Sequence, residues 1–198
     1  MVKEKLISKK IAIKRIDPHS LDTLLHPTLD EKSKTNVIAK GLPASPGAAS
    51  GKVVFSSDEA ERLNEMMQDT ILVRVETSPE DIQGMHAAKG ILTARGGMTS
   101  HAAVVARGMG RPCVSGSSEI DINYEKKTFK TSSVEIKEGE IITIDGSTGR
   151  IISGRVATLK PEISGDFSKL MSWADNYRKL NIRTNSETSK DTKIAKDF

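Results

Sequence analysis

The sequence has little cysteine, few aromatic residues and no long hydrophobic run. Its single cysteine, Cys113, excludes an internal disulfide and favours a reducing compartment. No apolar stretch reaches the roughly 18–20 residues that cross a bilayer, and the Lys-rich N-terminus lacks the apolar core of a signal peptide. We therefore expect a cytoplasmic protein without a membrane partner.

Charge of one sign is not concentrated in any part of the sequence either. The 30 Lys and Arg residues and the 26 Asp and Glu residues are mixed along the chain, which gives a formal net charge of +4. With only 4% aromatic residues and no recognisable nucleic-acid module, this pattern indicates a solvated surface and no nucleic-acid partner. The 198 residues suffice for one ordinary domain with linkers or for two small domains.

The stretch 93–107 places one histidine, His101, between a glycine turn and a short apolar helix. Residues 90–94 predict a short buried strand, and Gly96 and Gly97 predict a turn in backbone conformations that a Cβ would resist. The Ala- and Val-rich residues after the histidine predict a helix that is buried between layers and meets solvent only at its first turn.

The start of this helix is a favourable place for an anion. Thr99 or Ser100 can cap the helix, and the free N–H groups of its first turn add to the positive end of the helix dipole. A positive helix end also disfavours the imidazolium form of His101, which leaves a ring lone pair free to attack. The expected site is a nucleophilic His101 with Gly96, Gly97, Thr99 and Ser100 as phosphate-binding residues.

Asp81 is a further candidate residue for this site. Ser78 and Pro79 predict the start of another helix, and helix starts that follow parallel strands gather at one end of a sheet. Asp81 could therefore orient the imidazole of His101, although acidic residues are common at helix starts without any such role. His86, inside the same helix, is expected to be a surface or packed histidine.

Residues 41–52 are small and invite comparison with a nucleotide-binding P-loop. The comparison fails because Pro46 stands where the first motif glycine is needed, and Val53 stands where Ser or Thr would reach magnesium. We expect a loop that passes close to another backbone or to a phosphate. A metal hydrolase built on His101 and His86 is disfavoured, because no residues have the spacing of metal ligands, and no metal site is expected in this chain.

The predicted elements indicate a mixed α/β fold. The strand 90–95, the helix 100–108 and the strand 112–116 form a βαβ unit with two parallel strands. From Lys127 onward, hairpin turns separate short antiparallel strands. The other predicted elements are the strands 52–55, 71–75, 128–131, 134–136, 141–144 and 149–152 and the helices 56–67, 78–88 and 168–180.

Residues 96–110, together with 41–48 and 74–82, resemble the phosphohistidine domain of enzymes that use phosphoenolpyruvate. Within that group the resemblance is to the pyruvate phosphate dikinase family, because Met98 stands where phosphoenolpyruvate synthase and the sugar phosphotransferase Enzyme I usually carry Arg. The similarity covers essentially the whole chain. His101 matches the position of the family's phosphoryl carrier.

The resemblance implies an α/β fold: a three-layer β/β/α swivelling phosphohistidine domain with helical linkers at both ends. It implies that His101 is pyrophosphorylated by ATP, that inorganic phosphate takes the outer phosphoryl group as diphosphate, and that the remaining group converts pyruvate to phosphoenolpyruvate. In the family these reactions occur on an ATP-binding domain and on a (β/α)8 barrel that binds phosphoenolpyruvate or pyruvate, and Mg²⁺ belongs to those flanking sites. No cofactor is expected on this chain itself.

The resemblance also divides the chain into three parts. It implies that residues 1–37 are a helical linker from a nucleotide-binding domain, that 38–160 are the swivelling domain, and that 161–198 are a linker helix and the start of the barrel. The chain is then a fragment that is inactive alone, its partners are the two flanking domains of the same full-length protein, and the full-length protein is often a homodimer. The alternative is a non-catalytic interaction or regulatory domain that has kept the fold.

Overall fold

The computed structural model of the chain describes residues 1–18, 21, 25–30, 33, 35–159, 165–180 and 189–197. Contacts within the chain divide it into two units. One unit consists of Pro18–Glu162, and the other combines Met1–Asp17 with Ile163–Phe198.

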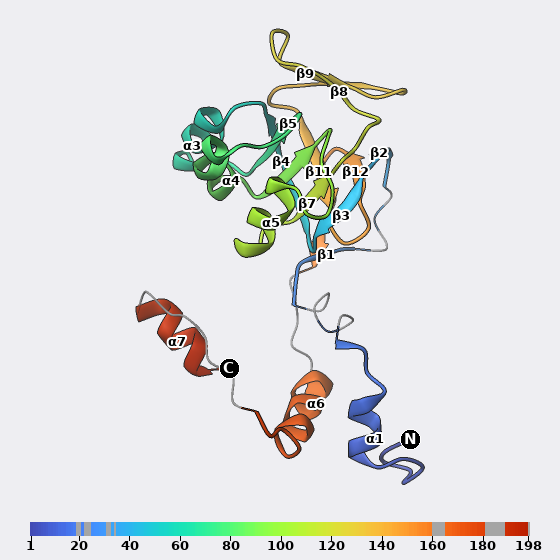
Figure 1. Ribbon diagram of the computed structural model, residues 1–198. Coiled ribbons are helices and arrows are strands. Elements are labelled where there is room, and N and C mark those ends of the chain that lie inside the picture. Colours follow the sequence, from blue (N-terminus) through green and yellow to red (C-terminus); the bar gives the residue numbers. More distant parts are fainter. Residues whose placement is uncertain are drawn as a thin grey trace. The chain divides into compact units, whose positions relative to one another are not determined.

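The larger unit is built on an eight-stranded sheet with the strand order β2-β12-β11-β4-β5-β6-β7-β3 (Figure 1). The four strands from β4 to β7 are parallel, and β3, β11, β12 and β2 pair in antiparallel fashion. The strands are β2 (Val37–Lys40), β3 (Leu42–Ser45), β4 (Ala48–Val54), β5 (Thr70–Arg74), β6 (Gly90–Thr93), β7 (Cys113–Ser115), β11 (Ile141–Asp145) and β12 (Arg150–Ser153). The predicted parallel βαβ unit and the antiparallel second half are confirmed.

Helices connect the parallel strands. They are α3 (Ser57–Glu65) after β4, the 3₁₀ turn η1 (Pro79–Asp81) with α4 (Ile82–Ala87) after β5, and α5 (His101–Gly108) after β6. At the start of α3, the Ser56 hydroxyl accepts a hydrogen bond from the Glu59 amide at 3.3 Å and so caps the helix. The chain therefore has the mixed α/β fold that its pattern indicated.

The sheet carries a different hydrophobic core on each face, because successive strand residues point to opposite sides. Val54, Leu72 and Ile91 belong to the core that holds the buried residues of α3, α4 and α5. Their neighbours Val53 and Ile71 belong to the other core, which includes Phe129 and Ile136 of a separate three-stranded sheet. That sheet has the order β10-β9-β8 and consists of β8 (Asp121–Asn123), β9 (Thr128–Lys130) and β10 (Glu135–Lys137).

The prediction of a loop over 41–52 was wrong, since most of this segment forms β3 and β4. Gly47, with φ +107°, provides the turn between the two strands. The expected close approach to another backbone is confirmed, because a Cβ on Gly51 would lie 2.7–2.8 Å from the backbone of Thr70. Small residues occur here because the neighbouring strand leaves no room for larger ones.

Two short strands, β1 (Thr28–Leu29) and β13 (Thr158–Leu159), pair in antiparallel fashion. The sequence suggested no strand at either position. Leu29 is buried with Ala48, Ile152 and Val156. The pairing therefore depends on residues that are far away in the sequence, and these two-residue strands show no alternating pattern of hydrophobic and polar residues.

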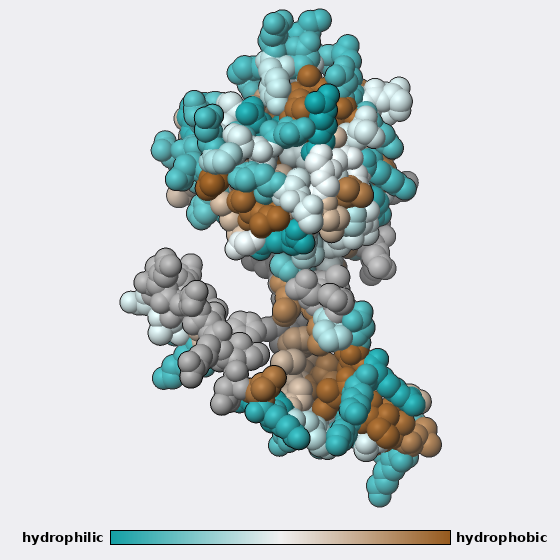
Figure 2. Space-filling view, in the orientation of Figure 1, coloured by the Kyte–Doolittle hydropathy of each residue, from teal (hydrophilic) through white to brown (hydrophobic). Residues whose placement is uncertain are grey.

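The smaller unit contains the helices α1 (Lys9–Lys14), α6 (Gly165–Asp175) and α7 (Ser189–Asp197). α1 contacts α6, and Lys9 Nζ lies 5.5 Å from the ring centroid of Trp173. Hydrophobic side chains are exposed on this unit (Figure 2), including Leu6, Ile11 and Met171. The role of these helices as linkers stays a prediction. None of the helices in the described part of the chain has the length and apolarity that crossing a bilayer requires.

Candidate functional site

His101 is the first residue of α5, directly after the loop that leaves the C-terminal end of β6. Ser100 is the N-cap, and its hydroxyl accepts a hydrogen bond from the Ala103 amide at 3.4 Å. Thr99, the other predicted cap residue, is exposed. The prediction that one of these two residues caps the helix is therefore confirmed for Ser100.

A chain of hydroxyl groups anchors this cap to the sheet. Ser100 Oγ and Ser115 Oγ share a hydrogen bond at 3.3 Å, and Ser115 Oγ and Thr93 Oγ1 share another at 3.1 Å. Ser115 and Thr93 are fully buried at the ends of β7 and β6. The position of the helix start, and with it of His101, is thus fixed to two adjacent strands.

The two glycines before the helix play different structural roles. Gly96 has φ +113°, and a Cβ there would lie 2.9 Å from Ser115 Oγ and 3.0 Å from Ser100 Oγ. Gly97 has open space around its Cα, and its carbonyl accepts a hydrogen bond from the Ser100 amide at 3.0 Å. Glycine is therefore required by conformation and space at position 96 but by neither at position 97.

Backbone N–H groups remain available in the loop before α5. Within the described part of the chain, the amides of Gly97, Met98 and Thr99 donate no hydrogen bond. The Met98 carbonyl, in contrast, accepts a hydrogen bond from the guanidinium of Arg107, which joins the loop to its own helix. Free amides at a helix start are donors for an anionic group such as a phosphoryl group.

The imidazole of His101 has a partner that the sequence did not suggest. His101 Nδ1 and Thr77 Oγ1 share a hydrogen bond at 3.0 Å. Thr77 follows β5 as His101 follows β6, and these two strands are parallel neighbours, so both residues lie at the same edge of the sheet. Nδ1 is therefore engaged, whereas Nε2 makes no hydrogen bond to any residue that the structure describes.

Asp81 lies at the expected helix start, but its contacts differ from the expected ones. Its carboxylate accepts hydrogen bonds from the Ser57 hydroxyl at 2.9 Å and from the Ser78 amide at 2.9 Å. It also lies 3.3 Å from Arg74 Nε. Among the described residues, Asp81 has no hydrogen bond to His101, so it does not orient the imidazole by direct contact.

Neither the cysteine nor the second histidine of this region contributes to the site. Cys113 is fully buried in β7, and burial raises the pKa of its thiol to about 12, so it is a packed, unreactive side chain. His86 is exposed on α4. The described residues contain no group of three or more His, Cys, Asp or Glu side chains that could hold a metal ion.

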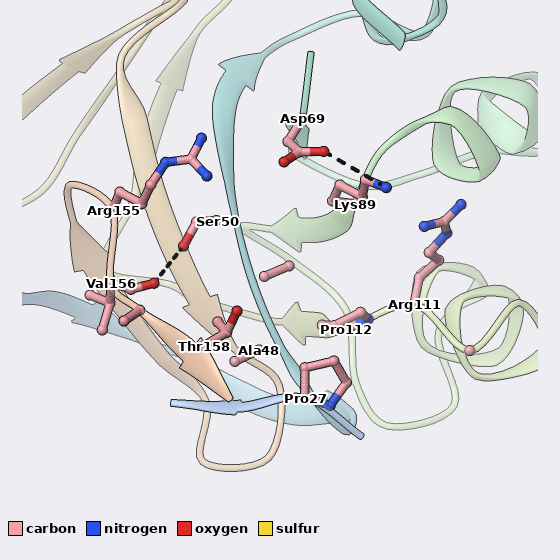
Figure 3. Close-up of a pocket in the computed structure, with 13 residues that line it drawn as sticks. Pro27, Ala48, Ser50, Asp69, Lys89, Arg111, Pro112, Arg155, Val156 and Thr158 are labelled. Atoms are coloured by element: carbon pink, nitrogen blue, oxygen red, sulfur yellow. Dashed lines mark hydrogen bonds and ion pairs between the residues drawn. The ribbon is translucent and has the colours of Figure 1, made fainter. Parts of the chain in front are cut away.

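A cavity of about 760 Å³ lies elsewhere in the larger unit (Figure 3). Asp69, Lys89 and Arg111 line it, and they precede β5, β6 and β7, whereas His101 follows the opposite, C-terminal end of β6. Lys89 pairs with Asp69 at 3.7 Å, and Arg111 donates to the carbonyl of His86 at 2.8 Å. The cavity is therefore at the far edge of the parallel strands from the histidine.

The segment that contains the described site is similar to a known type of domain. Residues 66–149 match the family model of the PEP-utilising enzyme, mobile domain. The match covers 84 of the 198 residues, so this segment is similar to that family. The matched segment includes His101 with its partner Thr77, the cap Ser100 and the buried Ser115.

Similarity to curated relatives extends beyond residues 66–149 to the whole chain. The chain is 57% identical over 198 residues to a pyruvate, phosphate dikinase of Rhizobium meliloti, and 55% identical over 194 residues to that of Clostridium symbiosum. It is 51% identical over 199 residues to pyruvate, phosphate dikinase 2 of Zea mays. These matches cover 97–100% of the chain but only 22% of each relative, so the chain spans about a fifth of their length.

Proposed function

We propose that this mobile domain is a phosphoryl carrier and that His101 Nε2 is the atom that carries the phosphoryl group. One observation supports the proposal above the others. The hydrogen bond between Thr77 and His101 occupies Nδ1 and leaves Nε2 as the ring nitrogen without a described partner. The proposal applies to a longer protein of the pyruvate, phosphate dikinase type, of which this chain would supply the carrier segment.

The proposed transfer makes one bond and breaks one. In the neutral ring, Nδ1–H donates to Thr77 Oγ1, so the Nε2 lone pair attacks the donor phosphorus as the bond from phosphorus to its leaving oxygen breaks. The electron pair of that bond leaves with the oxygen. The ring gains positive charge, which Thr77 Oγ1 stabilises at Nδ1–H, and no proton needs to leave the imidazole.

The loop before α5 is proposed to stabilise the phosphoryl group once it is on the histidine. The free amides of Gly97, Met98 and Thr99 can donate to its oxygens, and the start of α5 contributes the positive end of its dipole. Arg107 adds positive charge beside the same loop. Gly96 and Ser100 act indirectly in this account, because they fix the loop conformation and the helix start.

The partners in this proposal are an ATP-binding domain and a domain that binds phosphoenolpyruvate or pyruvate, both in the same longer chain. ATP, phosphate and pyruvate would then yield AMP, diphosphate and phosphoenolpyruvate, with Mg²⁺ held outside this segment. We further interpret the two cores of the sheet as a three-layer β/β/α arrangement, with the three-stranded sheet on one face and the helices on the other. A compact carrier of this kind suits transfer between two separate sites.

A chimera tests the proposed function. This chain replaces the matching segment in the Rhizobium meliloti relative, with which it shares 57% identity, and turnover of pyruvate, ATP and phosphate is measured. We expect turnover by the chimera and its loss on His101→Asn, whereas the matched control His86→Asn retains activity. Full turnover by the His101→Asn chimera would contradict the proposal. A folded chimera that never turns over would favour the alternative, an interaction domain without catalysis.

A further inference from the structure

The segment that carries Thr77 is held at both of its ends. On one side of Thr77, the Val75 amide donates a hydrogen bond to Tyr124 Oη at 2.8 Å. On the other side, the Ser78 amide donates to Asp81 Oδ2 at 2.9 Å. The hydroxyl that meets His101 therefore lies between two side-chain anchors that come from different parts of the chain.

The two anchors share a third side chain, Arg74. Its guanidinium carbon lies 5.3 Å from the ring centroid of Tyr124, and its Nε lies 3.3 Å from Asp81 Oδ1. Arg74 also donates to the carbonyl of Phe55 at 3.0 Å, and the ring of Phe55 meets that of Tyr124 edge to face, at 6.5 Å and 89°. Tyr124 and Asp81 are thus parts of one connected cluster.

The same cluster reaches the glycine loop. The Val75 carbonyl accepts a hydrogen bond from the Arg95 amide at 2.9 Å, one residue before Gly96. The peptide groups on either side of Val75 therefore connect Tyr124 with the loop that leads to His101. Since Tyr124 follows β8, this contact ties the three-stranded sheet to both loops that meet at the histidine.

We propose that Tyr124 and Asp81 are positioning residues for His101. They hold residues 75–78 so that Thr77 Oγ1 accepts a hydrogen bond from Nδ1–H, which leaves the ring lone pair on Nε2. The expected effect on the rate of phosphorylation rests on the proposed function, whereas the expected effect on the imidazole tautomer does not. Tyr124 acts through Val75, and Asp81 acts through Ser78, so neither residue needs to touch the imidazole.

The imidazole tautomer can be measured on this chain alone by ¹⁵N NMR, because the sequence has only four histidines. We expect His101 to carry its proton on Nδ1, and Thr77→Val to shift the population towards the Nε2–H form. Tyr124→Phe keeps the ring and removes the acceptor oxygen, so it should shift the tautomer in the same direction but less. The matched control is Tyr177→Phe, which removes the hydroxyl of the other tyrosine, in the smaller unit.

A double variant separates positioning from a merely structural role. If Tyr124 acts through Thr77, then Thr77→Val with Tyr124→Phe gives the same tautomer population as Thr77→Val alone. Asp81→Asn should shift the tautomer as Tyr124→Phe does. An unchanged tautomer in both Tyr124→Phe and Asp81→Asn, or fully additive shifts in the double variant, would overturn the inference. Circular dichroism of each variant identifies any that fail to fold, and Thr77→Ser, which restores the hydroxyl, then serves as the rescue.

The chimera measures how the loss of the Tyr124 hydroxyl affects the rate at which His101 is phosphorylated. We expect Tyr124→Phe to slow the phosphorylation of His101 by about two- to tenfold, which corresponds to the loss of one neutral hydrogen bond. If the chimera carries no label on His101 while the tautomer shifts occur, the proposed function fails and the positioning role stands. If labelling occurs but Tyr124→Phe changes neither its rate nor the tautomer, the positioning role fails alone.

Discussion

Replacement of Gly96 with alanine should distort the loop before His101 through two separable effects. Holding an alanine at φ +113° costs about 1–3 kcal/mol. The new Cβ would also lie 2.9 Å from Ser115 Oγ and 3.0 Å from Ser100 Oγ, so the hydrogen bond between these hydroxyls, worth roughly 0.5–1.5 kcal/mol, is disrupted. Together these effects predict that Gly96→Ala lowers the free energy of unfolding by about 1.5–4.5 kcal/mol.

Gly97→Ala is the matched control for this prediction. Position 97 has no positive φ, and no described residue beyond its two chain neighbours has a heavy atom within 4 Å of the place that an alanine Cβ would occupy. Alanine there should therefore raise the free energy of unfolding by about 0.4–1 kcal/mol, because it reduces the conformational entropy of the unfolded chain. Urea unfolding followed by far-UV circular dichroism measures both variants. The fluorescence of the single tryptophan, Trp173, is a poor substitute, because it belongs to the smaller unit. Equal destabilisation by the two substitutions would refute the reasoning.

Further predictions concern the helix cap and the buried thiol. Ser100→Ala removes the cap of α5 and should lower the free energy of unfolding by about 0.5–2 kcal/mol, whereas Thr99→Ala, at an exposed position, should change it by less than about 0.5 kcal/mol in the same urea assay. If Thr99→Ala instead caused the large loss of unfolding free energy, the assignment of the cap to Ser100 would be wrong. Burial raises the pKa of Cys113 to about 12 from 9.0, so only the unfolded thiol ionises between these values and stability falls as pH rises through this window. At pH 10, wild type should have lost about 1.4 kcal/mol more than Cys113→Ala, relative to pH 7; parallel pH profiles of the two proteins would contradict this.

The sequence was most informative where the physical cause is local. The cap at Ser100, the helix that starts at His101 and the special conformation of Gly96 depend on residues within a few positions of one another, and all three appear in the structure. The parallel β6 and β7 were also predictable, because strand, helix and strand follow in order over 90–116.

Contacts across strands could not be predicted in the same way. Thr77 and His101 are 24 residues apart, and their hydrogen bond exists only because β5 and β6 are neighbours. Asp81 was placed at the correct edge of the sheet by its helix start, but its partners Ser57 and Ser78 are closer competitors for its carboxylate than the imidazole is. The sequence did offer one signal for Thr77, because it is a polar residue that follows the strand next to β6. This signal does not distinguish Thr77 from its polar neighbours.

The most direct test of the account is the identity of the atom that becomes phosphorylated. The chimera is incubated with labelled phosphoenolpyruvate, and the product is analysed by acid and base stability, by mass spectrometry of the peptide that contains His101, and by NMR of the ring. We predict an acid-labile, base-stable phosphoryl group on Nε2 of His101, absent from His101→Ala. The same label on His101→Ala, or a label on Nδ1 of the wild-type histidine, would contradict the account.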